Sequence, residues 1–219
     1  MPLLSEHDQE TVRRRLEALT HDVRILFFSQ TIGAPDGVVV AKQILNEVAS
    51  LASRITVEEV NLILDRDRAA QFGIDRIPAI VLLRNGEDTR MRFLGAPAGY
   101  EFASLVDAIV LAGTGDSGLS DDSRAQIRTR ATAPLAIKVF VTPSCPHCPR
   151  VVTLAHRMAV ESSHVVATCI EATEFLDLSQ QYRVTGVPKT IVEGSDIEIL
   201  GAVSEETFVS TILPAGPAA

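Results

Sequence analysis

Apolar and polar positions along the chain follow two periods, and the series of elements that they predict occurs twice. In the first half, apolar residues at helical spacing predict helices over residues 5–19, 38–51, 66–72 and 100–111. Alternating or β-branched runs predict strands over residues 23–28, 55–63, 79–83 and 91–94, the last two joined by an Asn85-Gly86 hairpin turn. The second half predicts strands over residues 135–141, 165–170, 189–193 and 197–200, and helices over residues 120–129, 146–161, 174–182 and 204–213. Each half is thus expected to be an α/β unit, a central mixed β-sheet flanked by helices.

The second half also repeats residues of the first. Phe72-Gly-Ile-Asp-Arg-Ile-Pro78 matches Tyr182-Arg-Val-Thr-Gly-Val-Pro188, at an offset of 188 − 78 = 110 residues. Between the halves, residues 113–118 contain three glycines and no large apolar side chain, which is typical of a linker. We therefore predict two tandem units, residues 1–113 and 120–219, with the linker at about 113–119.

Composition and charge exclude several classes of partner. Apolar residues make up 46% of the 219 residues and charged residues 22%, which is ordinary for a globular protein. The net charge of −8 argues against nucleic acid and anionic membranes as partners. No apolar run approaches the roughly 18 residues of a membrane span, and the N-terminus lacks the basic and apolar regions of a secretory signal. A cysteine pair in such a chain favours redox work in the cytoplasm.

The candidate chemistry lies in Cys145-Pro146-His147-Cys148, which follows the predicted strand 135–141 and opens the predicted helix 146–161. Two cysteines three positions apart in a first helical turn lie on one face, so their sulfurs can meet. Unpaired backbone N–H groups and the helix dipole stabilise a thiolate there, chiefly at Cys145. Pro146 suits a first turn, and a charged His147 would stabilise the thiolate further, making the disulfide more oxidising. This pattern predicts thiol–disulfide exchange.

Two alternatives compete for the cysteine pair: a structural disulfide, or half of a zinc site. A closed zinc site needs four ligands, and the remaining cysteine, Cys169, stands alone in another apolar run. Cys169 is most simply a small buried core residue. We therefore expect no metal and no cofactor.

Each half has a proline directly before a strand, Ile77-Pro78 and Val187-Pro188. Such a proline either simply starts the strand or forms a cis peptide in a tight turn. If Pro188 is cis and faces the cysteines, the backbone of Val187 is free to pair with a substrate strand. The first half has no cysteine, and the repeat places Pro35-Asp-Gly-Val38 at the equivalent position. Its role is either to stabilise the second half or to bind substrate.

The segments at residues 77–81, 92–102, 115–120, 139–150, 171–175 and 186–190 together resemble the glutaredoxin-like protein disulfide oxidoreductases, which fuse two thioredoxin-fold units. The resemblance covers nearly the whole chain. It implies that Cys145 is the attacking thiol, Cys148 the resolving thiol, and Pro188 a cis proline opposite them. Family members often carry a CxxC in each unit, so the loss of the first argues against a relay of disulfides between units. The Cys-Pro-His-Cys site is similar to that of bacterial oxidases that donate disulfides.

A buried acid on the strand before the cysteines often accepts protons in thioredoxins, but the matching position here is Val139. Glu171, beside Cys169, could take this role if it points under the cysteine pair, or it could be a strand-end charge in water.

The sequence thus predicts a dithiol–disulfide oxidoreductase acting on protein thiols and disulfides. One alternative is an electron donor to a peroxidase, fed by a flavoprotein disulfide reductase. Another is a non-catalytic tandem thioredoxin-fold adaptor or holdase.

Overall fold

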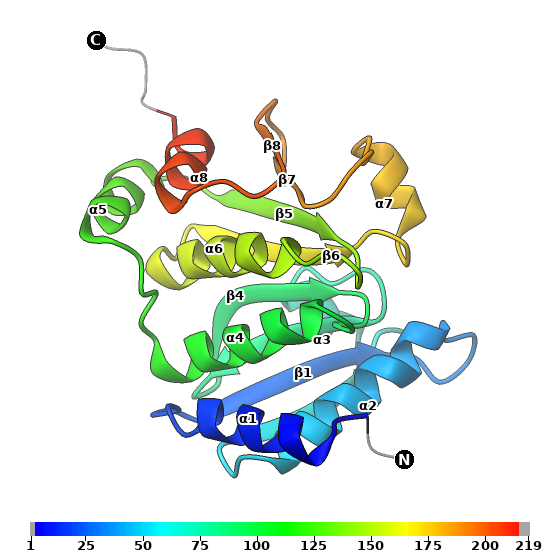
Figure 1. Ribbon diagram of the computed structural model, residues 1–219. Helices are drawn as coiled ribbons and strands as arrows, with labels where there is room; N and C mark the ends of the chain where they lie inside the picture. Colours follow the sequence, from blue (N-terminus) through cyan, green and yellow to red (C-terminus); the bar gives the residue numbers. More distant parts are fainter. Residues whose placement is uncertain (1–2, 215–219) are drawn as a thin grey trace.

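The computed structural model describes residues 3–214. Its first unit contains α1 (Glu6–Leu16), β1 (Val23–Ser29), α2 (Asp36–Ser50), β2 (Ile55–Asn61), α3 (Arg66–Gln71), β3 (Ala79–Arg84), β4 (Glu87–Leu94) and α4 (Glu101–Thr114). Its second unit contains α5 (Asp121–Arg130), β5 (Leu135–Val141), α6 (Cys148–Glu161), β6 (Val165–Glu171), α7 (Leu176–Gln181), β7 (Lys189–Val192), β8 (Glu198–Leu200) and α8 (Glu205–Ile212). Figure 1 shows these elements along the chain. Every helix and strand predicted from the sequence is present.

The two units share one continuous sheet of eight strands, in the order β2-β1-β3-β4-β6-β5-β7-β8. The join is a parallel pairing of β4 with β6, in which Met91 to Leu94 lie beside Ala167 to Ile170. The pattern of apolar residues predicted a separate sheet in each unit and did not reveal this join. Joining the sheets removes one exposed edge from each unit, which protects edges that would otherwise pair with other chains.

Strand directions bring the corresponding loops of both units to the same edge of the sheet. β1 is parallel to β2, β5 is parallel to β6, and two antiparallel steps through β3 make β1 parallel to β4 and hence to β6. The loops that follow β1 and β5 therefore lie on one side of the molecule, where both strands end (Figure 1).

The position that corresponds to the cysteine pair is two residues earlier than the repeat suggested. The loop between β1 and α2 and the loop between β5 and α6 have the same length, so Cys148 corresponds to Asp36 (148 − 36 = 112) rather than to Val38. The offset falls to 110 only at β2 and β6 (165 − 55), because α2 and the turn after it are each one residue longer. The first unit has no cysteine on either count.

Helices cover both faces of the sheet, which explains why β1 and β3 bury apolar residues on both sides. On β1, Ile25 and Phe27 face the main core with α1, α2, α4 and α6, whereas Leu26 and Phe28 face the smaller core under α3. On β5, Val139 faces the main core and Phe140 the core under α7. Figure 1 shows α1, α2, α4 and α6 side by side over one face.

The predicted linker is partly helical. α4 continues to Thr114, and a Cβ atom at Gly113 would meet the side chain of Leu19, which would have to shift. This glycine therefore allows α4 to lie close to the segment after α1. The domain bounds 1–113 and 120–219 stay a prediction, and both extend beyond the described residues.

His156 of α6 lies in the main core, where its ring is 5.1 Å from the ring of Phe93 on β4, centroid to centroid. It is 1% exposed, and neither ring nitrogen makes a hydrogen bond of normal geometry within residues 3–214. Burial lowers the pKa of His156 from 6.5 to about 4. The unfolded chain therefore binds more protons than the folded one between these two pH values.

We expect acid to destabilise the fold through His156. Because the folded pKa is the lower one, this contribution to stability is complete above pH 6.5 and is about 2 kcal/mol smaller at pH 5. A His156→Leu variant should lose less stability than the wild type between pH 7.5 and 5, measured by chemical denaturation. The exposed His164 provides the control, since His164→Gln should keep the wild-type slope. Equal slopes for His156→Leu and the wild type would contradict this account.

Candidate active site

The cysteine pair lies in the turn between β5 and α6. Cys145 and Cys148 form a disulfide with their Cα atoms 5.5 Å apart, and the backbone N–H of Cys145 donates to the carbonyl of Thr142 at 3.1 Å. The sequence predicted that this helix begins at Pro146, but α6 begins at Cys148. The proline in its first turn is Pro149, whose fixed φ favours a helix start at this point. Pro146 and the exposed His147 therefore lie in the turn before the helix.

The two cysteine residues differ in exposure. Cys145 is 8% exposed and Cys148 is fully buried at 0%. Both lie at the N-terminus of α6, where unpaired N–H groups and the helix dipole favour a negative charge. An incoming disulfide can therefore approach Cys145, while Cys148 is placed to act from inside.

Both prolines that precede strands follow cis peptide bonds, Ile77–Pro78 and Val187–Pro188. Pro188 comes directly before β7, where Lys189 is paired with Phe140 of β5. It therefore lies level with Val141, the last residue of β5 before the cysteine loop. This placement of Val187 and Pro188 beside the loop agrees with the expectation from the sequence.

The first unit contacts the cysteine loop directly. The backbone N–H of Tyr100 donates to the carbonyl of Pro143 at 2.9 Å. Gly99 has a φ of +59° and lies against the same carbonyl, where a Cβ atom would collide with it. Only glycine allows the backbone to approach this closely. The segment before α4 thus supports the loop that carries Cys145.

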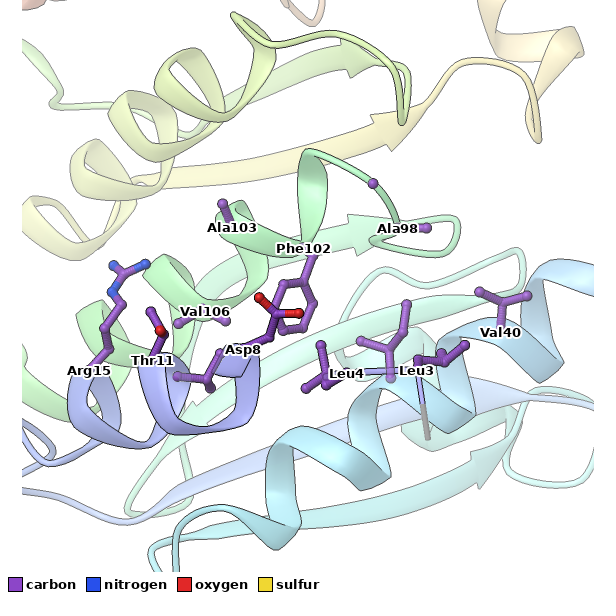
Figure 2. A pocket seen from close by; sticks show the side chains of 13 residues that line it. Leu3, Leu4, Asp8, Thr11, Arg15, Val40, Ala98, Phe102, Ala103 and Val106 are labelled. Carbon is purple, nitrogen blue, oxygen red and sulfur yellow. The ribbon is translucent and has the colours of Figure 1, made fainter. Parts of the chain in front are cut away.

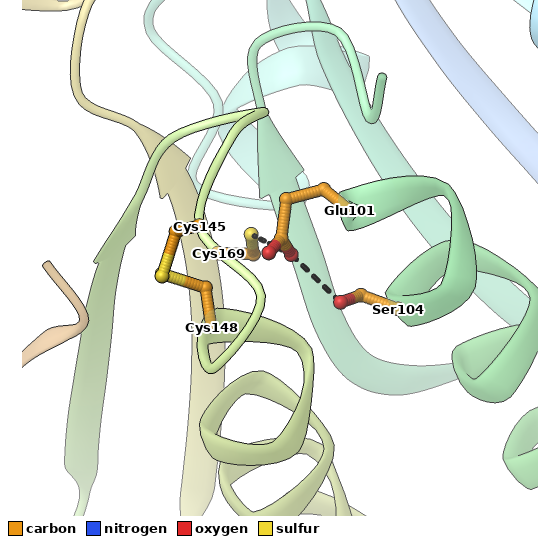
Figure 3. Close-up of a disulfide and its surroundings, with 5 residues drawn as sticks. All are labelled: Glu101, Ser104, Cys145, Cys148 and Cys169. Carbon is orange, nitrogen blue, oxygen red and sulfur yellow. Dashed lines mark hydrogen bonds between the residues drawn. A yellow bond between two sulfur atoms is a disulfide. The ribbon is translucent and has the colours of Figure 1, made fainter. Parts of the chain in front are cut away.

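The residue that follows this contact, Glu101, was not identified by sequence reasoning. It is 2% exposed, and its Oε2 accepts hydrogen bonds from Ser104 Oγ at 2.7 Å and from Cys169 Sγ at 3.6 Å. Burial raises the pKa of Glu101 from 4.5 to about 7, against the opposing effect of these donors. Figure 3 shows its carboxyl group, Cys169 and the disulfide in one region between α4 and α6. Its burial arises from packing between the two units, which no local pattern shows.

Glu171, the acid suggested by the sequence, is also buried, at 3% exposure. Its carboxylate oxygens accept hydrogen bonds from the backbone N–H groups of Thr173 and Glu174 and from the Thr173 hydroxyl. These bonds hold the turn after β6. A role for Glu171 in proton transfer stays a prediction.

An apolar cavity of about 510 Å³ lies in the first unit, between α1, α2 and the start of α4 (Figure 2). Leu4, Val40 and Phe102 line it, and Asp8 and Arg15 add charged groups. Ala98 and Gly99 form part of its wall, so the cavity adjoins the segment that supports the cysteine loop. It contains no thiol.

Neither a metal-binding cluster nor a membrane-spanning helix occurs in the part of the chain that the structure describes. Within residues 3–214, no group of three or more His, Cys, Asp or Glu side chains is arranged to hold a metal ion. No described helix is long and apolar enough to cross a bilayer. The alternative of half a zinc site therefore lacks further ligands among these residues.

Two fused units of this topology, with a disulfide at the start of α6 and a cis proline beside it, define a tandem thioredoxin-fold oxidoreductase. The second unit matches the thioredoxin domain family over residues 135–214. The chain as a whole is similar to thioredoxin-fold oxidoreductases, and its Cys145–Cys148 pair is of the kind that performs dithiol–disulfide exchange.

Known proteins resemble the chain over nearly its full length. The NTD_N/C domain of alkylhydroperoxide reductase AhpF from Enterococcus faecalis superposes with a TM-score of 0.88 and 26% identity, covering 95% of this chain and 99% of that one. A protein disulfide oxidoreductase from Aeropyrum pernix gives 0.86 and 25%, covering 95% and 91%. An alkyl hydroperoxide reductase polypeptide of Staphylococcus epidermidis is 28% identical over 197 residues, 89% of this chain and 35% of that protein. The chain thus spans about a third of that relative's length.

Proposed function

We propose that Cys145 and Cys148 exchange disulfides with protein substrates, with Cys145 as the attacking thiol. The Cys145 thiolate attacks one sulfur of a substrate disulfide, and the other substrate sulfur leaves as a thiolate. The resulting mixed disulfide joins Cys145 to the substrate. Cys148 then attacks the Cys145 sulfur, releases the second substrate thiolate, and closes the Cys145–Cys148 disulfide. The substrate gains the two electrons that the cysteine pair loses, and the same steps run in reverse when the disulfide is donated.

The observation that carries this assignment is the difference in exposure of the two cysteine residues, 8% for Cys145 and 0% for Cys148. A substrate reaches Cys145 more readily than Cys148, since attack requires access to the sulfur. Cys148, buried beside it, meets only the mixed disulfide that Cys145 has formed.

Cys148 must lose its proton before it can attack, and Glu101 is the buried acid that we assign as acceptor. A base with a pKa near the working pH is most effective in proton transfer, and that of Glu101 is about 7. Its Oε1 has no hydrogen-bond partner among the described residues, so this oxygen is available to receive a proton. The first unit would then contribute an acid to chemistry that its own cysteine-free loop cannot perform.

A Cys148→Ser variant tests the assignment. We expect it to accumulate a stable mixed disulfide with a disulfide-bonded model protein, because the serine hydroxyl cannot attack the Cys145 sulfur. Non-reducing gel electrophoresis and mass spectrometry would detect the adduct and locate it. Full dithiol turnover in this variant, or an adduct at a residue other than Cys145, would contradict the proposal.

Substrate recognition is assigned to the residues beside the loop. The backbone of Val187, held next to Cys145 by the Pro188 turn, would pair with an extended stretch of the substrate around its cysteine. Such pairing accepts many sequences, because main-chain groups make the hydrogen bonds. This fits general protein thiols as partners, in the cytoplasm.

A second candidate function is electron transfer to a peroxidase, with a flavoprotein disulfide reductase as donor. The observation that favours it is the likeness to the NTD_N/C domain of alkylhydroperoxide reductase AhpF, which covers 99% of that chain. In this case the Cys145–Cys148 disulfide receives electrons from the flavoprotein and passes them to a peroxidase disulfide.

Coupled assays separate the two functions. The purified chain would be combined with a flavoprotein disulfide reductase, a thiol peroxidase and hydroperoxide, and NAD(P)H consumption would be followed. Consumption that requires all components and disappears in a Cys145→Ser variant supports electron donation. If the chain instead oxidises a reduced model protein and accepts nothing from the reductase, disulfide donation is the better account.

A further inference from the structure

The free cysteine of the chain, Cys169, lies on β6, the strand next to the one that leads into the cysteine pair. Cys169 of β6 is in register with Val139 of β5 on one side and with Phe93 of β4 on the other. It is 3% exposed and belongs to the same core as Cys145 and Cys148. A buried cysteine in this position needs no function, since cysteine packs as a small apolar residue. Its contact with Glu101 distinguishes it from such a residue.

Glu101 Oε2 has two donors, the Ser104 hydroxyl at 2.7 Å from its own helix and the Cys169 thiol at 3.6 Å from the sheet. The two donors come from different units and fix the carboxyl group between α4 and β6, as Figure 3 shows. Because both bonds go to Oε2, Oε1 is left without a partner among the described residues. A buried carboxylate oxygen without a donor is unfavourable for stability. Its retention beside a redox centre suggests a use.

We propose that Cys169 is a positioning residue for proton transfer: its S–H group holds Glu101 so that the other carboxyl oxygen serves Cys148. The proposal deepens the proposed function and rests on Glu101 as the acceptor. The Ser104 hydroxyl bonds the carboxyl group from within α4, whereas the Cys169 thiol bonds it from β6 of the sheet.

The same contact keeps Cys169 out of the redox chemistry. Burial, and then the negative charge and hydrogen bond of Glu101, raise the pKa of the Cys169 thiol well above its usual value. A thiol without thiolate character neither attacks disulfides nor oxidises readily. Cys169 can therefore lie in the same core as the exchanging disulfide without taking part in the exchange. In return its S–H bond stabilises the ionised form of Glu101, which burial alone would disfavour.

Two variants separate positioning from plain packing. Cys169→Ser keeps a donor at this place, whereas Cys169→Val keeps an apolar side chain of similar size without a donor. If Cys169 only fills the core, valine should replace it well and serine poorly, because serine buries a polar group. If Cys169 positions Glu101, the serine variant should keep the wild-type pH dependence of the proton-transfer step, and the valine variant should not.

The measured quantity is the resolving step in the reaction of the reduced protein with the aromatic disulfide DTNB, followed by stopped flow from pH 5.5 to 9. The first thionitrobenzoate leaves when Cys145 attacks DTNB. The second leaves when Cys148, after passing its proton to Glu101, attacks the Cys145 sulfur of the mixed disulfide. For Cys169→Val we expect the midpoint of the second phase to move up by about half a pH unit or more, the size expected for one lost hydrogen bond. For Cys169→Ser we expect the wild-type midpoint, and for both variants an unchanged first phase.

Two results would overturn the inference: wild-type midpoints in both variants, or a shift in Cys169→Ser that Cys169→Val lacks. A Glu101→Gln variant distinguishes this failure from that of the proposed function. If Glu101→Gln removes the pH dependence while Cys169→Val leaves it in place, only the role of Cys169 is wrong. If Glu101→Gln also leaves it in place, Glu101 is not the acceptor.

Discussion

A Cys145→Ser variant is expected to have no dithiol turnover above the uncatalysed background. Cys145 is the residue that attacks the substrate disulfide, and the fully buried Cys148 cannot replace it in this step. Insulin reduction by dithiothreitol, followed by turbidity, would measure the loss. Circular dichroism should show an unchanged fold, because serine is close in size to cysteine.

Ser210→Ala, at an exposed side chain on α8, is the control and should keep turnover. Substantial activity in Cys145→Ser would mean that Cys148 or another group meets the substrate first. The assignment of attacking and resolving thiols would then be reversed or wrong.

The second large effect is expected at Glu101. A Glu101→Gln variant should slow the resolving step by about 10²-fold at pH 8, the lower end of the range for loss of a general base. The wild-type rate should rise with pH through about 7, where the Glu101 carboxyl group loses its proton, and the variant should lack this rise. The attack by Cys145 should be unaffected. Glu206→Gln, at an exposed carboxyl group on α8, is the control and should behave as the wild type.

The same substitution should increase stability. The pKa of Glu101 is raised on folding, so its contribution to stability is complete below pH 4.5 and is lost as pH rises through about 7. Well above pH 7 the buried charge costs the folded state about 3 kcal/mol, most of which Glu101→Gln should recover. Urea denaturation at pH 8 would measure this gain. A variant that is slower but no more stable would argue against a buried ionised carboxylate.

Local patterns were sufficient to predict the elements of the fold. The apolar run from Ile25 to Phe28 and the turn at Asn85-Gly86 act over a few residues, so their signals are complete in the sequence. The pairing of β4 with β6 is different, because it depends on two strands more than 70 residues apart whose apolar faces would suit many neighbours. The start of α6 was placed too early because Pro146 and Pro149 both suit a first turn.

The candidate site divides in the same way. Cys145, Cys148 and Pro188 carry their chemistry in their residue types and spacing, and the structure brings them to one edge of the sheet. Glu101 has the pattern of an ordinary acidic residue in a first helical turn, which is normally exposed. It becomes a buried acid only because α4 of one unit packs against α6 of the other. The same packing gives Cys169 a partner that its sequence neighbours do not supply.

The reduction potential of the Cys145–Cys148 pair tests the central claim most directly. The protein would be equilibrated with glutathione buffers, and its free thiols alkylated, separated and located by mass spectrometry. We predict one reversible two-electron transition in which Cys145 and Cys148 change together and Cys169 stays reduced. A potential near −120 to −180 mV, about that of disulfide donors, would support tuning by Pro146 and His147, and one near about −270 mV would favour electron donation to a peroxidase. The absence of a reversible transition, or one that involves Cys169, would contradict the account.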